Sequence, residues 1–347
     1  MTRAPARPTR DEWPAGWVER AACFDDVDLI LELVNARSQK LWGERQTTRD
    51  GVEVFLSSPR LDPNADVRLV LDGDGALAGM AFVGNPGEPY ADLACPALSH
   101  PRHEDEAGHI DRLQSWTLQR ADELATLASP DIRVVASAFA AAHDQAWRAA
   151  LDRAGFRLVR VHNHMRTDLA TPSTGAPSPA GIAIRTAVIE QDLEPVVACR
   201  EEAWRGQWGF VERPLDQALA ERREAIKAQG DTFDPTLWFL AVEGTEIVGL
   251  SLCDDRIVDD KTRGYVNTLA VRPAWRKRGI AFALLQHTFA EFRQRGYAAV
   301  ELDIDSQNLT GVSRLCDRAG MRVVRQFVTY EKELRPRIDL ATRRLPA

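Results

Sequence analysis

The sequence has few cysteines, and none of them is placed to hold a metal ion or to form a CxxC redox centre. An odd number of widely spaced thiols is typical of a protein kept in a reducing compartment. We therefore expect a cytoplasmic protein with free thiols and without a metal site. The five cysteines are Cys23, Cys95, Cys199, Cys253 and Cys316.

Long hydrophobic runs and an excess of positive charge are also missing. No stretch reaches the roughly 20 apolar residues that cross a bilayer, and the N-terminal residues lack the apolar core of a secretory signal. The chain carries 44 Lys and Arg against 51 Asp and Glu, a net charge of −7, so nonspecific attraction to nucleic acid is not expected. These absences leave small molecules as the predicted partners, with no nucleic acid and no membrane, in a monomer or a homodimer.

The amino-acid composition of the 347-residue chain changes sharply in one segment. Residues 171–181, "TPSTGAPSPAG", consist mainly of Pro, Gly, Ser and Thr, which predicts a linker. The segments on either side have the size of ordinary domains. We predict domains at 17–170 and 182–336, with tails at 1–16 and 337–347.

The two halves repeat one another. Residues 152–169, "DRAGFRLVRVHNHMRTDL", align without a gap with residues 317–334, "DRAGMRVVRQFVTYEKEL". Residues 67–83 resemble residues 237–253 at nearly the same offset, and each of these reads as a strand, a tight turn and a strand. The repeats predict two copies of one α/β fold, each with a mixed central sheet flanked by helices.

Positive charge is concentrated in "RPAWRKRGIAFALL", residues 272–285, where a strand is predicted to give way to a helix. The first amides of a helix have no intrahelical acceptor and form an anion site. Gly279 lets a ligand approach this backbone. The loop therefore predicts a pyrophosphate site, and the alternative is a solvated basic loop before an ordinary helix.

Two segments of the second half carry a family resemblance. "VNTLAVRPAWRKRGIAFALL", residues 266–285, resembles motif A of the GCN5-related N-acetyltransferases, the GNAT family. "SQNLTGVSRLCDRAGMRVV", residues 306–324, resembles motif B of the same family. Two such copies in one chain are similar to the arrangement in mycothiol synthase and related tandem acetyltransferases.

This resemblance implies an N-acetyltransferase that takes acetyl-CoA as cosubstrate and a small-molecule amine as acceptor. It implies that the pyrophosphate lies on the amides of the cationic loop and that the pantetheine arm runs beside the preceding strand. The cofactor-binding residues it implies are Leu269, Ala270, Val271, Arg276, Lys277, Arg278, Gly279, Ile280, Ala281 and Asn308.

The first half differs from the second at the loop. Glu104, Asp105 and Glu106 lie close to where the second copy has its three cations, and carboxylates there would repel a pyrophosphate. We therefore predict that the N-terminal domain has lost the usual mode of CoA binding and that the C-terminal domain is catalytic. The alternative is an error of register, since Gly108 lies one residue further from its proline than Gly279 does.

The proton acceptor is left open between several residues. Where the family often has a strand Glu, this chain has Asn267, which can orient a water but cannot take a proton. Asp303, between Glu301 and Asp305 on the next strand, is either part of a solvated edge or the base. The pair at 254–255 is a second carboxylate candidate.

The proton donor to the leaving thiolate is equally open. Cys316 stands where motif B of the family has a Tyr, and it is either an acid or a small packed residue. Tyr330 on the last predicted strand is a substitute donor. Because the strand Glu and the motif B Tyr are both missing, the rival hypothesis is a non-catalytic acyl-CoA-binding or sensing protein.

Overall fold

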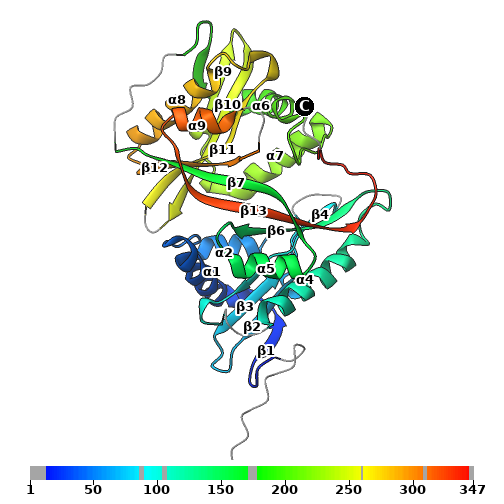
Figure 1. Cartoon of the computed structure of the whole chain (residues 1–347). Helices are drawn as coiled ribbons and strands as arrows, with labels where there is room; N and C mark the ends of the chain where they lie inside the picture. Colours follow the sequence, from blue (N-terminus) through cyan, green and yellow to red (C-terminus); the bar gives the residue numbers. More distant parts are fainter. Residues whose placement is uncertain are drawn as a thin grey trace, which may run out of the picture. The chain divides into compact units, whose positions relative to one another are not determined.

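A computed structural model describes residues 13–85, 90–103, 108–170, 178–258, 261–307 and 311–343 of the chain (Figure 1). Contacts divide the chain into two compact units. The N-terminal unit takes its described residues from Met1–Val161 and Gln326–Asp339, and the C-terminal unit takes its own from His162–Arg325 and Leu340–Ala347.

The N-terminal unit contains an antiparallel sheet in the order β1-β2-β3-β5 and a second group in which β4 runs parallel to β6 and β6 pairs with β13. Its described strands are β1 (Val18–Ala21), β2 (Val67–Leu71), β3 (Leu77–Phe82), β4 (Asp92–Ala94), β5 (Ala97–Ser99), β6 (Val134–Ala141) and most of β13 (Arg322–Arg335). Its described helices are α1 (Val27–Trp42), α2 (Arg49–Leu56), α3 (Pro63–Asp66), α4 (His109–Ala125) and α5 (Gln145–Arg153).

The C-terminal unit contains strands in the order β7-β12-β11-β10-β9-β8, antiparallel except for the parallel pair β11 and β12. These strands are the part of β7 (Arg157–Asp168) from His162 onward, β8 (Ala183–Thr186), β9 (Trp238–Glu243), β10 (Glu246–Val258), β11 (Lys261–Val271) and β12 (Ala299–Asp305). The described helices are α6 (Ile189–Trp204), α7 (Leu215–Gln229), α8 (Ile280–Gln294) and α9 (Val312–Arg318).

The predicted fold class is confirmed, because mixed sheets flanked by helices form in both units. Both predicted hairpins are present as β2–β3 and β9–β10. The repeat extends to packing. A Cβ at Gly79 would lie 2.8 Å from Leu113 in α4, and one at Gly249 would lie 3.3 Å from Leu284 in α8. Each glycine thus lets a helix approach the sheet closely at the same place in the repeat.

Each half of the chain gives its last strand to the other unit. Residues 162–168 of β7 pair antiparallel with β12 in the C-terminal unit. Residues 327–335 of β13 pair antiparallel with β6 in the N-terminal unit. The units are therefore not two continuous stretches of chain, and the predicted linker, of which residues 171–177 lie outside the described part, does not by itself mark their limits.

Helix α8 shows how the sequence forms the core that supports the site. Its apolar residues recur three or four positions apart, which places them on one face of a helix. That face packs on the sheet in a cluster with Val266, Val300 and Leu302. Its fully buried members include Ile280, Leu284, Leu285, Phe289 and Phe292.

Candidate functional site

The sheet of the C-terminal unit opens between β11 and β12. The two strands pair only over Arg263–Tyr265 and residues 299–301. Beyond this point β11 continues to pair with β10 as far as Val271, opposite Gly249. The edge of β11 from residue 266 to residue 271 is thus not paired with β12, and backbone groups on such an edge can bind an extended ligand.

The far end of this edge leads to the first turn of α8. A short 3-10 turn at Pro273–Trp275 follows β11, and α8 begins after Gly279, whose φ is 83°. This left-handed backbone favours glycine. The amides of the first helical turn have no intrahelical acceptor, and the predicted anion site would lie on them.

The three cations of the loop do not act alike. The guanidinium of Arg276 donates to the backbone oxygens of Val271 and Ala203, at 3.1 and 2.7 Å, and so ties the loop to its own unit. Arg278 pairs with Glu243 at 2.7 Å. Lys277 is exposed and has a positive φ of 61°. Two of the predicted phosphate ligands thus have protein partners in this structure, and the backbone amides become the main candidates.

The N-terminal unit repeats the turn and the helix start. A 3-10 turn at Pro101–His103 follows β5, and α4 begins after Gly108, whose φ is 85°. Glu104, Asp105 and Glu106, on which the predicted loss of CoA binding rests, lie outside the described residues.

A β-bulge lies halfway along the open edge. Leu252 of β10 faces Thr268, whereas Cys253 faces Val266, so Asn267 is an extra residue on β11. Bulges redirect side chains and often lie beside functional sites. The side-chain amide of Asn267 donates to the carboxylate of Asp254 on β10. The bulge therefore brings together two residues that lie thirteen positions apart in the sequence.

Asp254 has the properties of a proton acceptor. Burial raises the pKa of this carboxyl, against the lowering effect of the Asn267 hydrogen bond and of the Arg256 charge. A carboxylate whose pKa is raised towards neutrality is a better general base than an ordinary one. Asp254 is half-buried, whereas its neighbour Asp255 is exposed.

Asp303 lies instead in an ionic cluster at the point where β11 and β12 separate. His164 Nδ1 is 2.7 Å from one carboxylate oxygen of Asp303, and the Tyr265 hydroxyl donates to the other at 2.6 Å. Although burial alone would raise the pKa of Asp303, these hydrogen bonds and the charge of His164 lower it. This makes Asp303 a weaker base than Asp254.

The histidine of this cluster is buried and charged. His164 Nε2 is 3.3 Å from Glu301, and Arg263 approaches the same carboxylate at 3.1 Å. Burial would lower the pKa of His164, but the hydrogen bond with Asp303 and the neighbouring carboxylate of Glu301 raise it to about 9. The cluster joins β7 to β12, so it holds the exchanged strand in the C-terminal unit.

The raised pKa of His164 predicts a pH dependence of stability. The pKa is about 9 in the folded chain against an ordinary 6.5, so folding favours the protonated ring. The stabilisation is fully present below pH 6.5 and is lost as the pH rises through 9. We expect His164→Gln to lower the free energy of unfolding more at about pH 6 than at about pH 9.5 in urea titrations. His143→Gln changes an exposed histidine and is the control, which should change the free energy of unfolding little at either pH. If His164→Gln lowered the free energy of unfolding equally at both pH values, His164 would not be charged in the cluster.

The remaining predicted catalytic residues are placed as follows. Cys316 on α9 is completely buried in the core, and burial raises the pKa of its thiol to about 12. This supports its interpretation as a packed residue, and we do not retain it as the acid. Tyr330 lies in the core of the N-terminal unit, where its hydroxyl accepts from Arg148 Nε at 3.3 Å, so the strand exchange removes it from the C-terminal unit. Asn308 lies outside the described residues.

Sequence reasoning undervalued Asp254 and missed His164. The carboxylate pair at 254–255 was visible, but nothing in the sequence marks the bulge that directs Asn267 to it. No motif in the sequence singles out His164. The alternating carboxylates of Glu301, Asp303 and Asp305 were the available signal, since the buried carboxylate of Glu301 requires a cation nearby.

Other kinds of site find no support in the part of the chain that the structure describes. No group of three or more His, Cys, Asp or Glu side chains is arranged to hold a metal ion there. None of the described helices has both the length and the apolar character needed to cross a membrane.

Comparisons with known sequences place this chain among acetyltransferases. Residues 198–315 match the Acetyltransferase (GNAT) family. A mycothiol acetyltransferase of Streptomyces scabiei is 26% identical over 309 residues, which cover 88% of this chain and 90% of that protein. A mycothiol acetyltransferase of Thermobispora bispora is 29% identical over 302 residues, which cover 85% and 92%.

Two solved structures resemble the chain over nearly its whole length. A GCN5-related N-acetyltransferase from Sphaerobacter thermophilus has a TM-score of 0.80 and 30% identity, covering 94% of this chain and 99% of its own. A tandem GNAT protein from the clavulanic acid biosynthesis pathway has a TM-score of 0.68 and 16% identity, covering 92% and 98%. The second likeness concerns the fold alone.

Proposed function

This chain belongs to the GCN5-related N-acetyltransferase (GNAT) family and is an N-acetyltransferase with two tandem domains of that fold, and we propose that it acetylates the primary amine of a small molecule in its C-terminal unit. Acetyl-CoA supplies the acetyl group as a thioester. The mycothiol acetyltransferases that resemble the chain support a small-molecule acceptor.

The observation that carries this proposal is the pairing of Asn267 with Asp254 at the bulge of β11. A bulge beside an unpaired strand edge places a half-buried carboxylate next to backbone groups that are free to bind a ligand. The pair provides a base on β10, beside the position on β11 where the usual Glu is missing. It therefore favours the enzyme over the non-catalytic binding protein.

The phosphates fit the start of α8. Gly279 has no Cβ to fill the space above the turn, and in this structure the nearest atom to such a Cβ would be Pro179 Cγ at 3.8 Å. The amides of Arg278 to Ala281 are the proposed donors to the pyrophosphate. Leu269 to Val271 are proposed to hold the pantetheine arm through their backbone groups.

The residues around the bulge are proposed to handle the protons. Asp254, in its ionised form, takes the proton that the acceptor amine must lose, directly or through one water that Asn267 orients. A backbone N–H near Val271 is proposed to stabilise the developing oxyanion. Since Cys316 is buried and Tyr330 lies in the other unit, we propose that the thiolate leaves without a dedicated protein acid.

Turnover with a panel of amines tests the proposed acceptor class. We expect the purified chain to release free CoA thiol from acetyl-CoA when given a suitable small amine, with the unacetylated precursor of mycothiol as the first arm. Amino sugars, amino-acid amides and short peptides form the other arms. If every small amine is inert while a protein or peptide amine is acetylated, the small-molecule assignment is wrong.

A further inference from the structure

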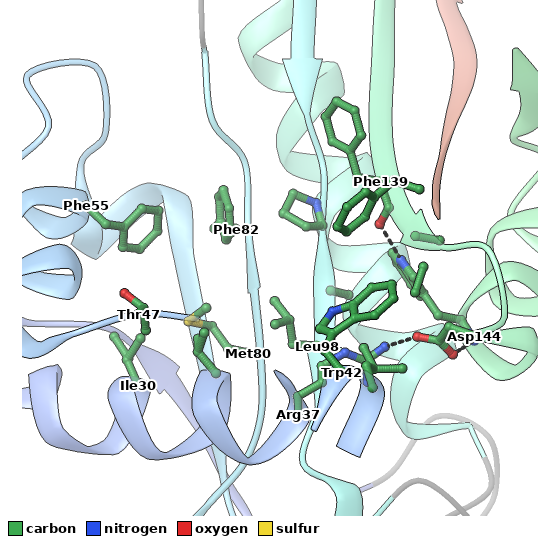
Figure 2. Close-up of a pocket in the computed structure, with 18 of the residues that line it drawn as sticks. Ile30, Arg37, Trp42, Thr47, Phe55, Met80, Phe82, Leu98, Phe139 and Asp144 are labelled. Carbon is green, nitrogen blue, oxygen red and sulfur yellow. Dashed lines mark hydrogen bonds and ion pairs between the residues drawn. The ribbon is translucent and has the colours of Figure 1, made fainter. Parts of the chain in front are cut away.

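The N-terminal unit contains a cavity of about 400 Å³, between α1, α2, β3, β5, β6 and α5 (Figure 2). Its volume falls within the range of small-molecule sites. All of its lining residues belong to the N-terminal unit, so it is separate from the proposed acetyl-transfer site. The proposed function does not explain it.

The course of the strands produces this cavity. β4 runs parallel to β6 as far as Ala94, and the N–H of Cys95 still donates to Ser137 at 2.7 Å. From Ala97 onward, β5 pairs with β3 instead. The sheet therefore opens between β5 and β6, and Ala140 on β6 leaves the opening unfilled because its side chain is small.

Aromatic side chains form much of the wall. Phe55 and Phe82 meet edge to face with their ring centroids 4.9 Å apart. Phe139 has 59% of its surface exposed, so the cavity reaches the outside of the molecule there. Ring faces and edges of this kind bind other aromatic rings favourably. The aromatic lining residues are Trp42, Phe55, Phe82, Phe139, Trp147 and Phe327.

The charged groups of the wall neutralise one another. Arg37 on α1 forms an ion pair with Asp144, and their side chains are only 10% and 9% exposed. Arg37 also donates to the backbone oxygen of Ser99 at 3.3 Å, and Asp144 accepts from the amide of Trp147 at 3.1 Å. A carboxylate or phosphate entering the cavity would have to break this pair, at the cost of a buried unpaired charge. The cavity therefore selects against anions.

The proton-handling residues of the C-terminal unit have no equivalent here. Gly79 pairs with Ser99 as Gly249 pairs with Val271. Gly84 follows Gly79 by as many residues as Asp254 follows Gly249, so Gly84 corresponds to Asp254. In the same way, Cys95 precedes Ser99 as Asn267 precedes Val271, so Cys95 corresponds to Asn267. Cys95 is completely buried, and burial raises the pKa of its thiol. The carboxylate in the cavity wall, Asp144, is held in its ion pair with Arg37, so it is a poor base towards a bound molecule, which is the arrangement of a binding site.

We propose that this cavity binds one uncharged, mainly aromatic small molecule and does not transform it. The strand divergence provides the space, the rings provide the contacts, and the Arg37–Asp144 pair provides selectivity against charge. The proposal does not depend on the acetyl-transfer site, and a failure of either leaves the other standing.

N-phenyl-1-naphthylamine, an uncharged aromatic dye whose fluorescence rises in apolar surroundings, is the probe for the full chain. We expect saturable binding at one site per chain. Met80→Trp fills the centre of the cavity, and Thr47→Trp fills it from a half-exposed position that tolerates a larger side chain if Met80→Trp does not fold. Either variant should weaken binding by at least about tenfold, because a filled cavity in a close-packed wall leaves no room for the dye.

Val54→Trp is the matched control, because Val54 is 71% exposed on α2 and does not line the cavity. It adds the same side chain and should leave dye binding unchanged. Acetyl-CoA should not displace the dye, and the anionic dye 1-anilinonaphthalene-8-sulfonate should bind more weakly. The proposal is overturned if the dye does not bind saturably, or if both filling variants bind it as tightly as the unmodified chain does. It is also overturned if acetyl-CoA displaces the dye or if the anionic dye binds more tightly.

Discussion

Replacing Gly279 with Asp is expected to raise the Kd of the chain for acetyl-CoA by at least about 100-fold, since two like charges about 4 Å apart repel by ~4 kcal/mol at an effective dielectric constant of 20. Gly279 is the residue before the first turn of α8 and has a φ of 83°. Aspartate tolerates this conformation better than most residues. Its carboxylate is also favourable at a helix N-terminus, so the helix should persist while the phosphate site is lost. Calorimetric titration with acetyl-CoA measures the change.

Gly108→Asp is the control for this variant. Gly108 precedes α4 with a φ of 85° and occupies the same place in the N-terminal unit. If acetyl-CoA binds only in the C-terminal unit, Gly108→Asp leaves both its Kd and the rate of acetyl transfer unchanged. Loss of binding in Gly108→Asp with full binding in Gly279→Asp would reverse the assignment of the two units.

Replacing Asp254 with Asn is expected to lower kcat by about 100- to 10,000-fold, the usual contribution of a general base. The substitution keeps the shape of the side chain and leaves acetyl-CoA binding intact, so the loss should fall on kcat rather than on the Kd for acetyl-CoA. Steady-state rates with a saturating amine, together with calorimetric titration of acetyl-CoA, separate the two.

The pH profile distinguishes a base from a structural carboxylate. Asp254 accepts a proton only when ionised, and burial raises the pKa of this carboxyl above its ordinary value, so activity falls as the solution is acidified through that pKa. Asp254→Asn should lose this acid limb. Asp255→Asn, which changes the exposed neighbour, should keep both the rate and the limb. If Asp254→Asn kept the same pH profile, Asp254 would not be the general base.

The cationic loop was predictable from the sequence because its parts are contiguous. A strand, a proline, a cationic run and a glycine before an apolar helix lie within residues 266–285. Such local signals determine where a helix begins and which amides stay unpaired. The roles of the cations were not predictable, because Arg276 contacts Ala203 and Arg278 pairs with Glu243, both distant in sequence.

The exchange of the last strands was not predictable in the same way. Residues 152–160 and 317–325, which lead into the two exchanged strands, are so similar that this local sequence does not indicate which sheet each strand joins. The pairings of β7 with β12 and of β13 with β6 depend on long-range contacts. His164, Glu301 and Asp303 form one such contact, in which the charge of each side chain is compensated by a residue from the other half of the chain.

The bulge at Asn267 shows the same limit at smaller scale. The sequence predicts the strand around it but not which residue β10 leaves unmatched. A slip of one residue moves a side chain to the other face of the sheet. The partnership of Asn267 with Asp254 therefore became visible only from the register.

A crystal structure of the chain grown with acetyl-CoA tests most directly whether the C-terminal unit alone binds the cosubstrate. The predicted result is one molecule per chain, with its diphosphate on the amides that follow Lys277 and none before α4. A diphosphate seated at Gly108, or a loop that stays empty after Pro273 at saturating acetyl-CoA, would contradict it.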